Sequence, residues 1–199
     1  SVIYPGSDLR HFTCPDDYTF PDNTVGMVYR LDTDKLDDKV IEVFIRAVKK
    51  KPGLLCYIIG GGYYLVYYKK RVSEEGLGRN FIFTGFVSYE SLPAYYRKIG
   101  LIVAPVNDES FGQVTPFAMG MGLPVVGYDT GAMKEILGTP ESLVKRGDIE
   151  ALAGLVVETM TNPRQRKQTE KKNKERAHRF FSVEKMMNGY ENLYKQYIT

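Results

Sequence analysis

The stretch from Asp108 to Pro116 has the residue types and spacing best suited to chemistry. It reads Asp-Glu-Ser-Phe-Gly-Gln-Val-Thr-Pro, so a carboxylate and a glycine-containing loop precede an expected helix. The first backbone N–H groups of a helix lack acceptors within it and attract anions. The Glu109 carboxylate repels phosphate but accepts hydrogen bonds from hydroxyl groups. A ligand with a phosphate and a polyol would use both features, whereas a capped helix preceded by a surface acid is the simpler alternative.

Two cations form a second candidate site. Arg30 directly follows an apolar run, and Lys35 comes five residues later. Arginine binds phosphate through two parallel hydrogen bonds, so the pair suits an anionic group. A solvated surface pair is the alternative. If both bind phosphate, the loss of Lys35 should matter less than the loss of Arg30, provided that the contact of Lys35 is the more exposed.

The three glycines Gly60–Gly62 lie between an apolar run and an expected helix, where a dinucleotide-binding loop would lie. The sequence lacks the G-x-G-x-x-G spacing, because Leu65 stands at the last position. A tight turn is therefore favoured over an NAD site and over an oxidoreductase that uses NAD.

The elements that must position these residues alternate along the chain. We expect strands at 24–29, 54–59, 81–83, 101–104, 124–127 and 143–144. Helices are expected after 37, from 63 to about 72, at 91–99, 115–121, 132–137 and 149–160, and twice within 165–197 with a break near Phe181-Ser182. Thr115 is the expected N-cap of its helix. Uninterrupted apolar runs such as Leu54–Ile59 are typical of parallel strands buried on both faces.

This alternation predicts an α/β fold, a Rossmann-like doubly wound parallel sheet of about six strands with a helical C-terminal tail. Ligands bind such sheets beyond the carboxyl ends of the strands. The loops 30–35, 60–62, 85–88 and 105–112 are therefore the places for a site.

The composition is that of a single globular domain. The chain has 199 residues, of which 43% are hydrophobic and 26% charged, and this excludes collagen-like, disordered and disulfide-scaffold classes. Apolar runs fall short of the roughly 20 residues that span a bilayer. Cys14 and Cys56 are too few for a disulfide framework and too far apart to suggest a metal pair, which favours a reducing compartment. His11 and His178 also lie far apart, so we expect no metal.

Positive charge is concentrated near the C-terminus. Residues 163–179 hold eight Lys or Arg and two Glu, a surplus of six, so the net charge of +3 leaves the rest of the chain at −3. Aromatic residues are not interleaved there, which disfavours nucleic acid as a partner. A solvated helix face, or an edge near acidic lipid, is preferred.

Taken in order, several segments resemble the C-terminal nucleotide-sugar-binding domain of group 1 glycosyltransferases of the GT-B fold. These segments are VIYPGSDLRHF, MVYRLDTDK, NFIFTGFVSYESLPAYYRKIGLIVAP and NDESFGQVTPFAMGMGLPVVGYDTGAMKEI. They are similar to the family patterns V-I-x-N-G-V-D-x-x-x-F, V-G-R-L-x-x-x-K, F-x-G-x-V with L-x-x-x-Y, and E-x-F-G with E-A-M-A-x-G-x-P-V-V and G-G-x-x-E. The chain departs from them at Pro5, Ser7, Tyr29, Phe117 and Ala132.

The resemblance assigns roles by position. Arg30 and Lys35 would bind the donor diphosphate, and Glu109 would contact hydroxyls of the transferred sugar; these three are the expected catalytic residues. The other expected donor-binding residues are Gly85, Phe86 and Val87 along the nucleobase, with Phe111, Gly112, Gln113, Val114 and Phe117 near sugar, phosphate and ribose. Glu135 matches a family position but receives no role.

Phe117 is the most serious departure, because the family has a second glutamate there, which holds the ribose hydroxyls. A phenyl ring accepts no conventional hydrogen bond. Either the ring turns into the core or it lines the donor site while backbone groups or water hold the ribose.

The resemblance implies that residues 1–199 are one domain, the donor-binding half of a retaining glycosyltransferase. Residues 1–12 would be an inter-domain segment and 163–199 C-terminal helices, with the N-terminal acceptor domain absent, so we expect no turnover from this piece alone. The expected partners are a nucleotide sugar and that missing domain, without a cofactor or nucleic acid. The setting would be polysaccharide biosynthesis in the cytoplasm, with peripheral association with the inner membrane face left open. A non-catalytic scaffold that lost turnover is the alternative.

Overall fold

The computed structural model describes residues 2–197, which are built around one six-stranded sheet. All strands are parallel, in the order β3-β2-β1-β4-β5-β6. They are β1 (Thr24–Val28), β2 (Leu55–Ile59), β3 (Phe81–Gly85), β4 (Leu101–Ala104), β5 (Val125–Asp129) and β6 (Leu143–Lys145). The predicted Rossmann-like fold is confirmed.

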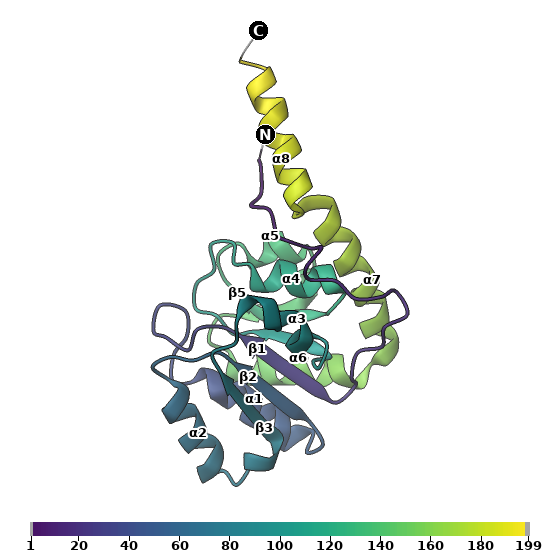
Figure 1. Cartoon of the computed structure of the whole chain (residues 1–199). Helices are drawn as coiled ribbons and strands as arrows, with labels where there is room; N and C mark the ends of the chain where they lie inside the picture. Colours follow the sequence, from purple (N-terminus) through teal and green to yellow (C-terminus); the bar gives the residue numbers. More distant parts are fainter. Residues whose placement is uncertain (1, 198–199) are drawn as a thin grey trace.

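Helices cover both faces of the sheet (Figure 1). They are α1 (Val40–Lys50), α2 (Leu65–Glu74), α3 (Leu92–Tyr96), α4 (Val114–Met121), α5 (Met133–Leu137), α6 (Ile149–Thr161), α7 (Pro163–Phe180) and α8 (Val183–Lys195). Short 3-10 turns occupy Gly78–Asn80, Tyr89–Ser91 and Pro140–Ser142. Helix α1 packs against α2 and α6 on one face, and α4 packs against α5 and α7 on the other.

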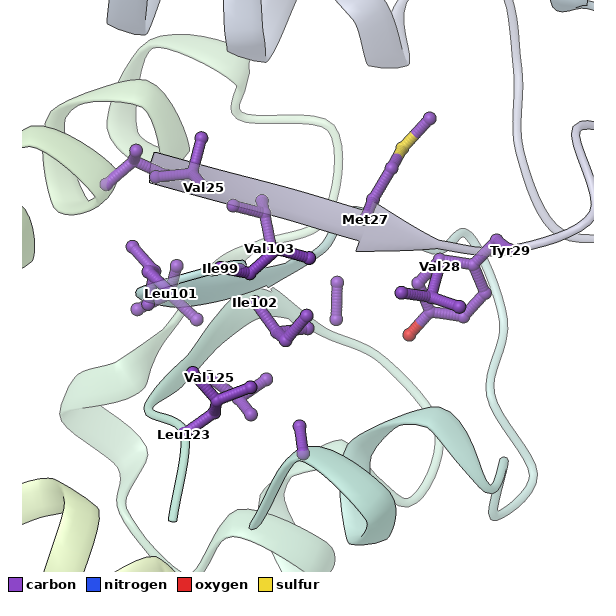
Figure 2. Packing of buried hydrophobic residues seen from close by; sticks show 14 of the residues in the cluster. Val25, Met27, Val28, Tyr29, Ile99, Leu101, Ile102, Val103, Leu123 and Val125 are labelled. Carbon is purple, nitrogen blue, oxygen red and sulfur yellow. The ribbon is translucent and has the colours of Figure 1, made fainter. Parts of the chain in front are cut away.

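The core follows the central strands. Every residue of β1 and of β4 is buried, because helices cover both faces, and their residues are accordingly apolar or small with the exception of Thr24. Figure 2 shows Val25 and Met27 along β1, with Leu101, Ile102 and Val103 of β4 beside them. Tyr29 lies just beyond the end of β1, where the core meets the loops. Cys56, in β2, is also buried.

The order of the strands reverses direction at one point of the sheet. The chain moves outward from β1 through β2 to β3, and then crosses back so that β4 pairs with the other side of β1. Sheets of this kind bind ligands at the carboxyl ends of the two strands where the direction reverses. The loops after β1 and β4 are therefore the first to inspect.

Some predicted boundaries are wrong. Helix α4 begins at Val114 with Gln113 at the N-cap position, so Thr115 is no cap. Instead, the Thr115 hydroxyl is buried, 3.8 Å from the sulfur of Met133. The helix expected at 91–99 is shorter and ends at Tyr96, after a 3-10 turn over Tyr89–Ser91.

The C-terminal helices match the prediction, with a break at Phe181-Ser182. The Ser182 hydroxyl caps α8 by accepting a hydrogen bond from the backbone N–H of Lys185 at 3.1 Å. Helix α8 extends away from the body of the domain, beside the N-terminal segment (Figure 1). Within residues 2–197, no helix combines the length and apolar character needed to cross a membrane.

Candidate functional site

The loops after β1 and β4 meet through an ion pair. Lys35 donates from Nζ to Oε1 of Glu109 at 3.0 Å and to the carbonyl oxygen of Asp108 at 3.2 Å. The backbone ties the same loops together, because the N–H of Asn107 donates to the carbonyl oxygen of Lys35 at 2.9 Å. Two of the three predicted catalytic residues, 74 positions apart in the sequence, thus lie in direct contact.

The Glu109 carboxylate is almost fully enclosed, with 4% of its side chain exposed. Gly112 allows this enclosure. Its backbone has a φ of +59°, and a Cβ atom there would lie 2.3 Å from Oε2 of Glu109. A side chain at position 112 would therefore collide with the carboxylate, and the left-handed conformation would also be strained.

A second glycine supports the backbone of Glu109. The N–H of Ala132 donates to the Glu109 carbonyl oxygen at 2.9 Å, and a Cβ on Gly131 would lie 2.0 Å from that same oxygen. The turn before α5 thus packs directly on the acidic loop. This explains in physical terms why the first glycine of the G-G-x-x-E pattern is retained here, whereas alanine fits at the second.

Arg30 has a different environment from Lys35. Its side chain is 73% exposed and pairs with Asp34 through a 2.7 Å contact between Nη2 and Oδ2. An anion that approached this loop would compete with Asp34 for the guanidinium and with Glu109 for Lys35. Both cations are therefore paired with carboxylates.

The N-terminus of α4 supplies the remaining positive potential. The first N–H groups of a helix point outward without intrahelical acceptors, and the helix dipole favours a negative charge there. The loop Glu109–Gln113 leads directly into this end of α4. Val114, the first helical residue, accepts a 3.3 Å hydrogen bond at its carbonyl oxygen from the Tyr96 hydroxyl, which holds the helix start against the core.

Two predicted donor-site side chains of this loop are engaged elsewhere. The Gln113 side chain accepts a hydrogen bond from the Ser7 hydroxyl at 2.6 Å. The Phe111 ring is half-buried and lies against Tyr4 and Phe181. Their backbone N–H groups, rather than their side chains, are the groups that remain for a ligand.

Phe117 turns into the core. Its residue is 8% exposed, and its ring stacks on Phe12 with centroids 3.8 Å apart and an interplanar angle of 4°. Tyr89 packs its edge against both rings. Of the two arrangements that the sequence left open, the structure has the buried one, because the aromatic Phe12 provides a partner for the ring.

The loop after β3 lies at the same edge of the sheet. The carbonyl oxygen of Gly85 accepts a hydrogen bond from the N–H of Gly60 at 3.0 Å, so the turn Gly60–Gly62 and this loop are joined. Phe86 is 85% exposed, whereas Val87 packs partly against the core. An exposed ring at this edge is available for contact with a flat, weakly polar ligand group.

Tyr29 is a residue to which the resemblance gives no role. Its hydroxyl is buried, with no hydrogen-bond partner among residues 2–197. Burial raises the pKa of this hydroxyl, and the negative charge of Glu109 raises it further. The departure at position 29, where the resembled pattern has glycine, is the feature of the sequence that could have drawn attention to this buried hydroxyl.

A separate hollow of the surface lies away from these loops. Its volume is about 660 Å³, and its walls come from residues before β1, the end of α4 and helix α7. Phe20, Met121 and Gly122 are among its lining residues. The start of β1 and the end of α4 lie at the amino edge of the sheet, so this hollow does not coincide with the loops described above.

Comparisons with known proteins all point to one family. A sequence model described as "Glycosyl transferases group 1" matches residues 19–176. The chain is 31% identical over 120 residues to 2-deoxystreptamine N-acetyl-D-glucosaminyltransferase of Streptomyces fradiae, covering 59% of this chain and 28% of that protein. It is 28% identical over 170 residues to the lipopolysaccharide core biosynthesis mannosyltransferase LpsB of Rhizobium meliloti, covering 76% and 48%.

The fold comparison agrees. Sucrose-phosphate synthase from Thermosynechococcus elongatus superimposes with a TM-score of 0.83 at 26% sequence identity, over 100% of this chain and 52% of that one. This chain therefore spans about a quarter to a half of the length of these three proteins.

Proposed function

Since this chain belongs to the group 1 glycosyltransferases, we propose that it binds a nucleotide diphosphate sugar at the carboxyl edge of its sheet. The observation that carries the proposal is the contact between Lys35 and the buried Glu109 at the start of α4. A cation, a hydroxyl acceptor and a helix N-terminus lie together there, and a sugar diphosphate has a matching group for each. The donor diphosphate would take Lys35, Arg30 and the N–H groups near Gly112.

The reaction in this proposal is the transfer of the sugar to a hydroxyl acceptor with retained configuration. The bond between the anomeric carbon and the diphosphate oxygen breaks, and its electron pair leaves with the diphosphate. The acceptor oxygen forms the new bond to carbon, and its proton passes to the released diphosphate. Lys35, Arg30 and the end of α4 stabilise the negative charge that develops on the leaving group.

Glu109 orients the sugar in this scheme. Its carboxylate is fixed by Gly112 and by the turn at Gly131, so it can accept hydrogen bonds from sugar hydroxyls in one place. When the diphosphate draws Lys35 away, those hydroxyls replace the lost hydrogen bond to Glu109. Binding of the diphosphate thus favours binding of the sugar, and binding of the sugar favours binding of the diphosphate.

The remaining parts of the proposal concern the whole protein. The acceptor would be bound by a separate domain, and the described residues would supply the donor half of an enzyme of polysaccharide or other glycoconjugate biosynthesis. The names of the Streptomyces and Rhizobium relatives support this setting. No cofactor or metal is part of the scheme, and association with a membrane surface is left to the whole protein.

A calorimetric screen of nucleotide sugars and nucleoside diphosphates tests the binding step. We expect at least one donor to bind residues 1–199, and Lys35→Ala to weaken it. Transfer to an acceptor by residues 1–199 alone would contradict the division of labour between two domains.

A non-catalytic scaffold is the second candidate. The burial of Phe117 favours it, because the ribose loses a charged acceptor. Failure of every common donor to bind in the same screen supports the scaffold.

A further inference from the structure

The N-terminal segment (residues 4–7) joins parts of the chain that are far apart in sequence. Tyr4 donates from its hydroxyl to Oε1 of Glu135, in α5, at 2.6 Å. The backbone N–H of Ser7 donates to the carbonyl oxygen of Phe181, at the break between α7 and α8, at 2.7 Å. The segment therefore bridges α5 and the C-terminal helices.

The same segment also touches the donor loop Glu109–Gln113. The Ser7 hydroxyl donates to Oε1 of Gln113 at 2.6 Å, and Nε2 of Gln113 donates to the carbonyl oxygen of Gly6 at 3.4 Å. Ser7 is 99% buried. Because serine stands here where the resembled pattern has valine, this bond to the loop is a feature of this chain rather than of the pattern.

Three aromatic rings reinforce the contact. The Tyr4 ring stacks on Phe111 of the donor loop with centroids 6.5 Å apart, and it meets Phe181 edge-on at 5.3 Å. Phe111 and Phe181 are also edge-to-face, at 5.5 Å. Aromatic pairs at these separations attract one another beyond their shared burial. The position of Phe111 thus depends on the position of Tyr4.

Small shifts of Phe111 would also move the backbone N–H groups near Gly112 that are proposed to bind the ligand. Gly112 is the next residue, and its α-carbon faces the Glu109 carboxylate so closely that a Cβ would lie 2.3 Å away. A tilt of the peptide between positions 111 and 112 therefore changes both the direction of an N–H group and the space around Glu109. Fixing Phe111 fixes the shape of the donor loop.

We propose that Tyr4 and Glu135 are positioning residues of the donor site, because their hydrogen bond holds the Tyr4 ring against Phe111 and so holds the loop Glu109–Gln113 in its ligand-binding shape. This inference rests on the proposed function for the identity of the ligand. It assigns Glu135 a role through Tyr4 rather than through contact with the sugar.

Because the Tyr4–Glu135 hydrogen bond is exposed, its loss should affect ligand affinity and global stability differently. The Tyr4–Glu135 bond lies at the surface, and such bonds contribute little to global stability. Its loss should therefore loosen one loop and leave the melting temperature nearly unchanged. A purely structural contact would lower both stability and affinity together.

The test compares four variants by calorimetry with UDP, GDP and ADP. Tyr4→Phe keeps the ring and removes the hydroxyl, and Glu135→Ala removes the acceptor. Each should weaken nucleoside diphosphate binding by about twofold to tenfold, the equivalent of one hydrogen bond. Glu135→Gln, which keeps an acceptor oxygen, should recover most of the affinity. The double variant Tyr4→Phe/Glu135→Ala should bind no more weakly than either single variant.

Tyr18→Phe is the matched control. The Tyr18 hydroxyl donates to the carbonyl oxygen of Arg97 at 2.8 Å, a comparable bond remote from the donor loop. This variant should bind the nucleoside diphosphates as the wild type does. Additive losses in the double variant, or an equal loss in the Tyr18 control, overturn the proposal.

Hydrogen–deuterium exchange separates this inference from the proposed function. Tyr4→Phe should speed exchange, without any ligand, at the amides of Ala132 and Phe117, which donate to the carbonyl oxygens of Glu109 and Gln113, while the amides of β1 and β4 stay protected. Unchanged exchange at these two amides overturns the inference. If the wild-type chain binds no nucleoside diphosphate, the proposed function fails, and the exchange result still decides whether Tyr4 holds the loop.

Discussion

The candidate-site loops after β1 and β4 and helix α7 both carry basic residues, but these residues have different surroundings. The loop after β1 carries Arg30 and Lys35, whereas α7 holds eight Lys or Arg within Pro163–Phe180. Several cations of α7 have structural partners. Arg176 donates to the carbonyl oxygens of Glu135 and Ile136, and Lys174 pairs with Asp16 at 2.7 Å.

The comparison teaches that placement, rather than the density of charge, marks the candidate site. Lys35 contacts a carboxylate that is almost fully buried and adjoins the N-terminus of a helix. Lys171 pairs loosely with Glu175 at 4.0 Å, with 80% and 67% of the two side chains exposed. Exposed pairs of this kind are screened by water and contribute little. Four predictions test this difference, in order of decreasing effect.

Gly112→Ala should have the largest effect. The added methyl group meets the Glu109 carboxylate and strains a left-handed backbone, so the free energy of unfolding should fall by about 2–3 kcal/mol. Nucleoside diphosphate binding should be lost with it. Urea unfolding and calorimetry measure the two effects.

Gly154→Ala is the control for that substitution. Gly154 lies within α6, and no atom lies within 4 Å of the position that its Cβ would occupy. The alanine should stabilise the fold by about 0.5–1 kcal/mol, since glycine is unfavourable inside a helix. A Gly112→Ala variant as stable as the wild type would show that the donor loop adapts freely.

Lys35→Ala should weaken nucleoside diphosphate binding by about 1.5–3 kcal/mol, the scale of a charged hydrogen bond. Arg30→Ala should cost less, because Arg30 is 73% exposed and the Lys35 side chain is 30% exposed. This reverses the order expected from the sequence, which depended on Lys35 being the more exposed. Calorimetry on both variants decides it, and equal affinities of both variants and the wild type would move the diphosphate elsewhere.

The third prediction concerns the ribose. Because Phe117 stacks on Phe12 within the core, it leaves no carboxylate at the position where the resembled pattern has glutamate. The chain should therefore distinguish ribose from 2′-deoxyribose nucleoside diphosphates by less than about tenfold, or roughly 1.4 kcal/mol. Competition binding with UDP and 2′-deoxy-UDP provides the measurement.

Phe117→Glu sharpens that prediction. A glutamate at this position should restore a preference for ribose if the fold survives. The observed stacking implies a considerable loss of stability, because an unpaired carboxylate would replace a buried ring. A strong ribose preference in the wild type would instead show that another group holds the hydroxyls.

The smallest effect is expected in α7. Lys167→Ala and Lys171→Ala should change nucleoside diphosphate affinity by less than about 0.5 kcal/mol, because these exposed side chains lie away from the donor loops. Lys35→Ala serves as the positive control in the same titrations. A loss at Lys167 comparable with that at Lys35 would contradict the contrast between the two regions.

Sequence patterns were sufficient to predict the architecture and the loops that carry the candidate site. Uninterrupted apolar runs such as those of β2 and β4 predicted buried parallel strands, and their alternation with amphipathic stretches predicted the Rossmann-like sheet. This works because hydrophobic periodicity is a local property of the chain. Strand ends were also predictable to within a few residues, so the loops at 30–35 and 105–112 were correctly placed at the carboxyl edge of the sheet.

The side chains that meet in those loops could not be predicted from sequence patterns, because their contacts depend on the tertiary fold. The contact of Lys35 with Glu109 depends on the pairing of β1 with β4, and the bond of Tyr4 with Glu135 joins residues 131 positions apart. The burial of Phe117 likewise depends on Phe12 lying over its ring. Local patterns carry no information on such partners, because a side chain's choice between core and site is made by the free energy of packing against residues that the fold brings together.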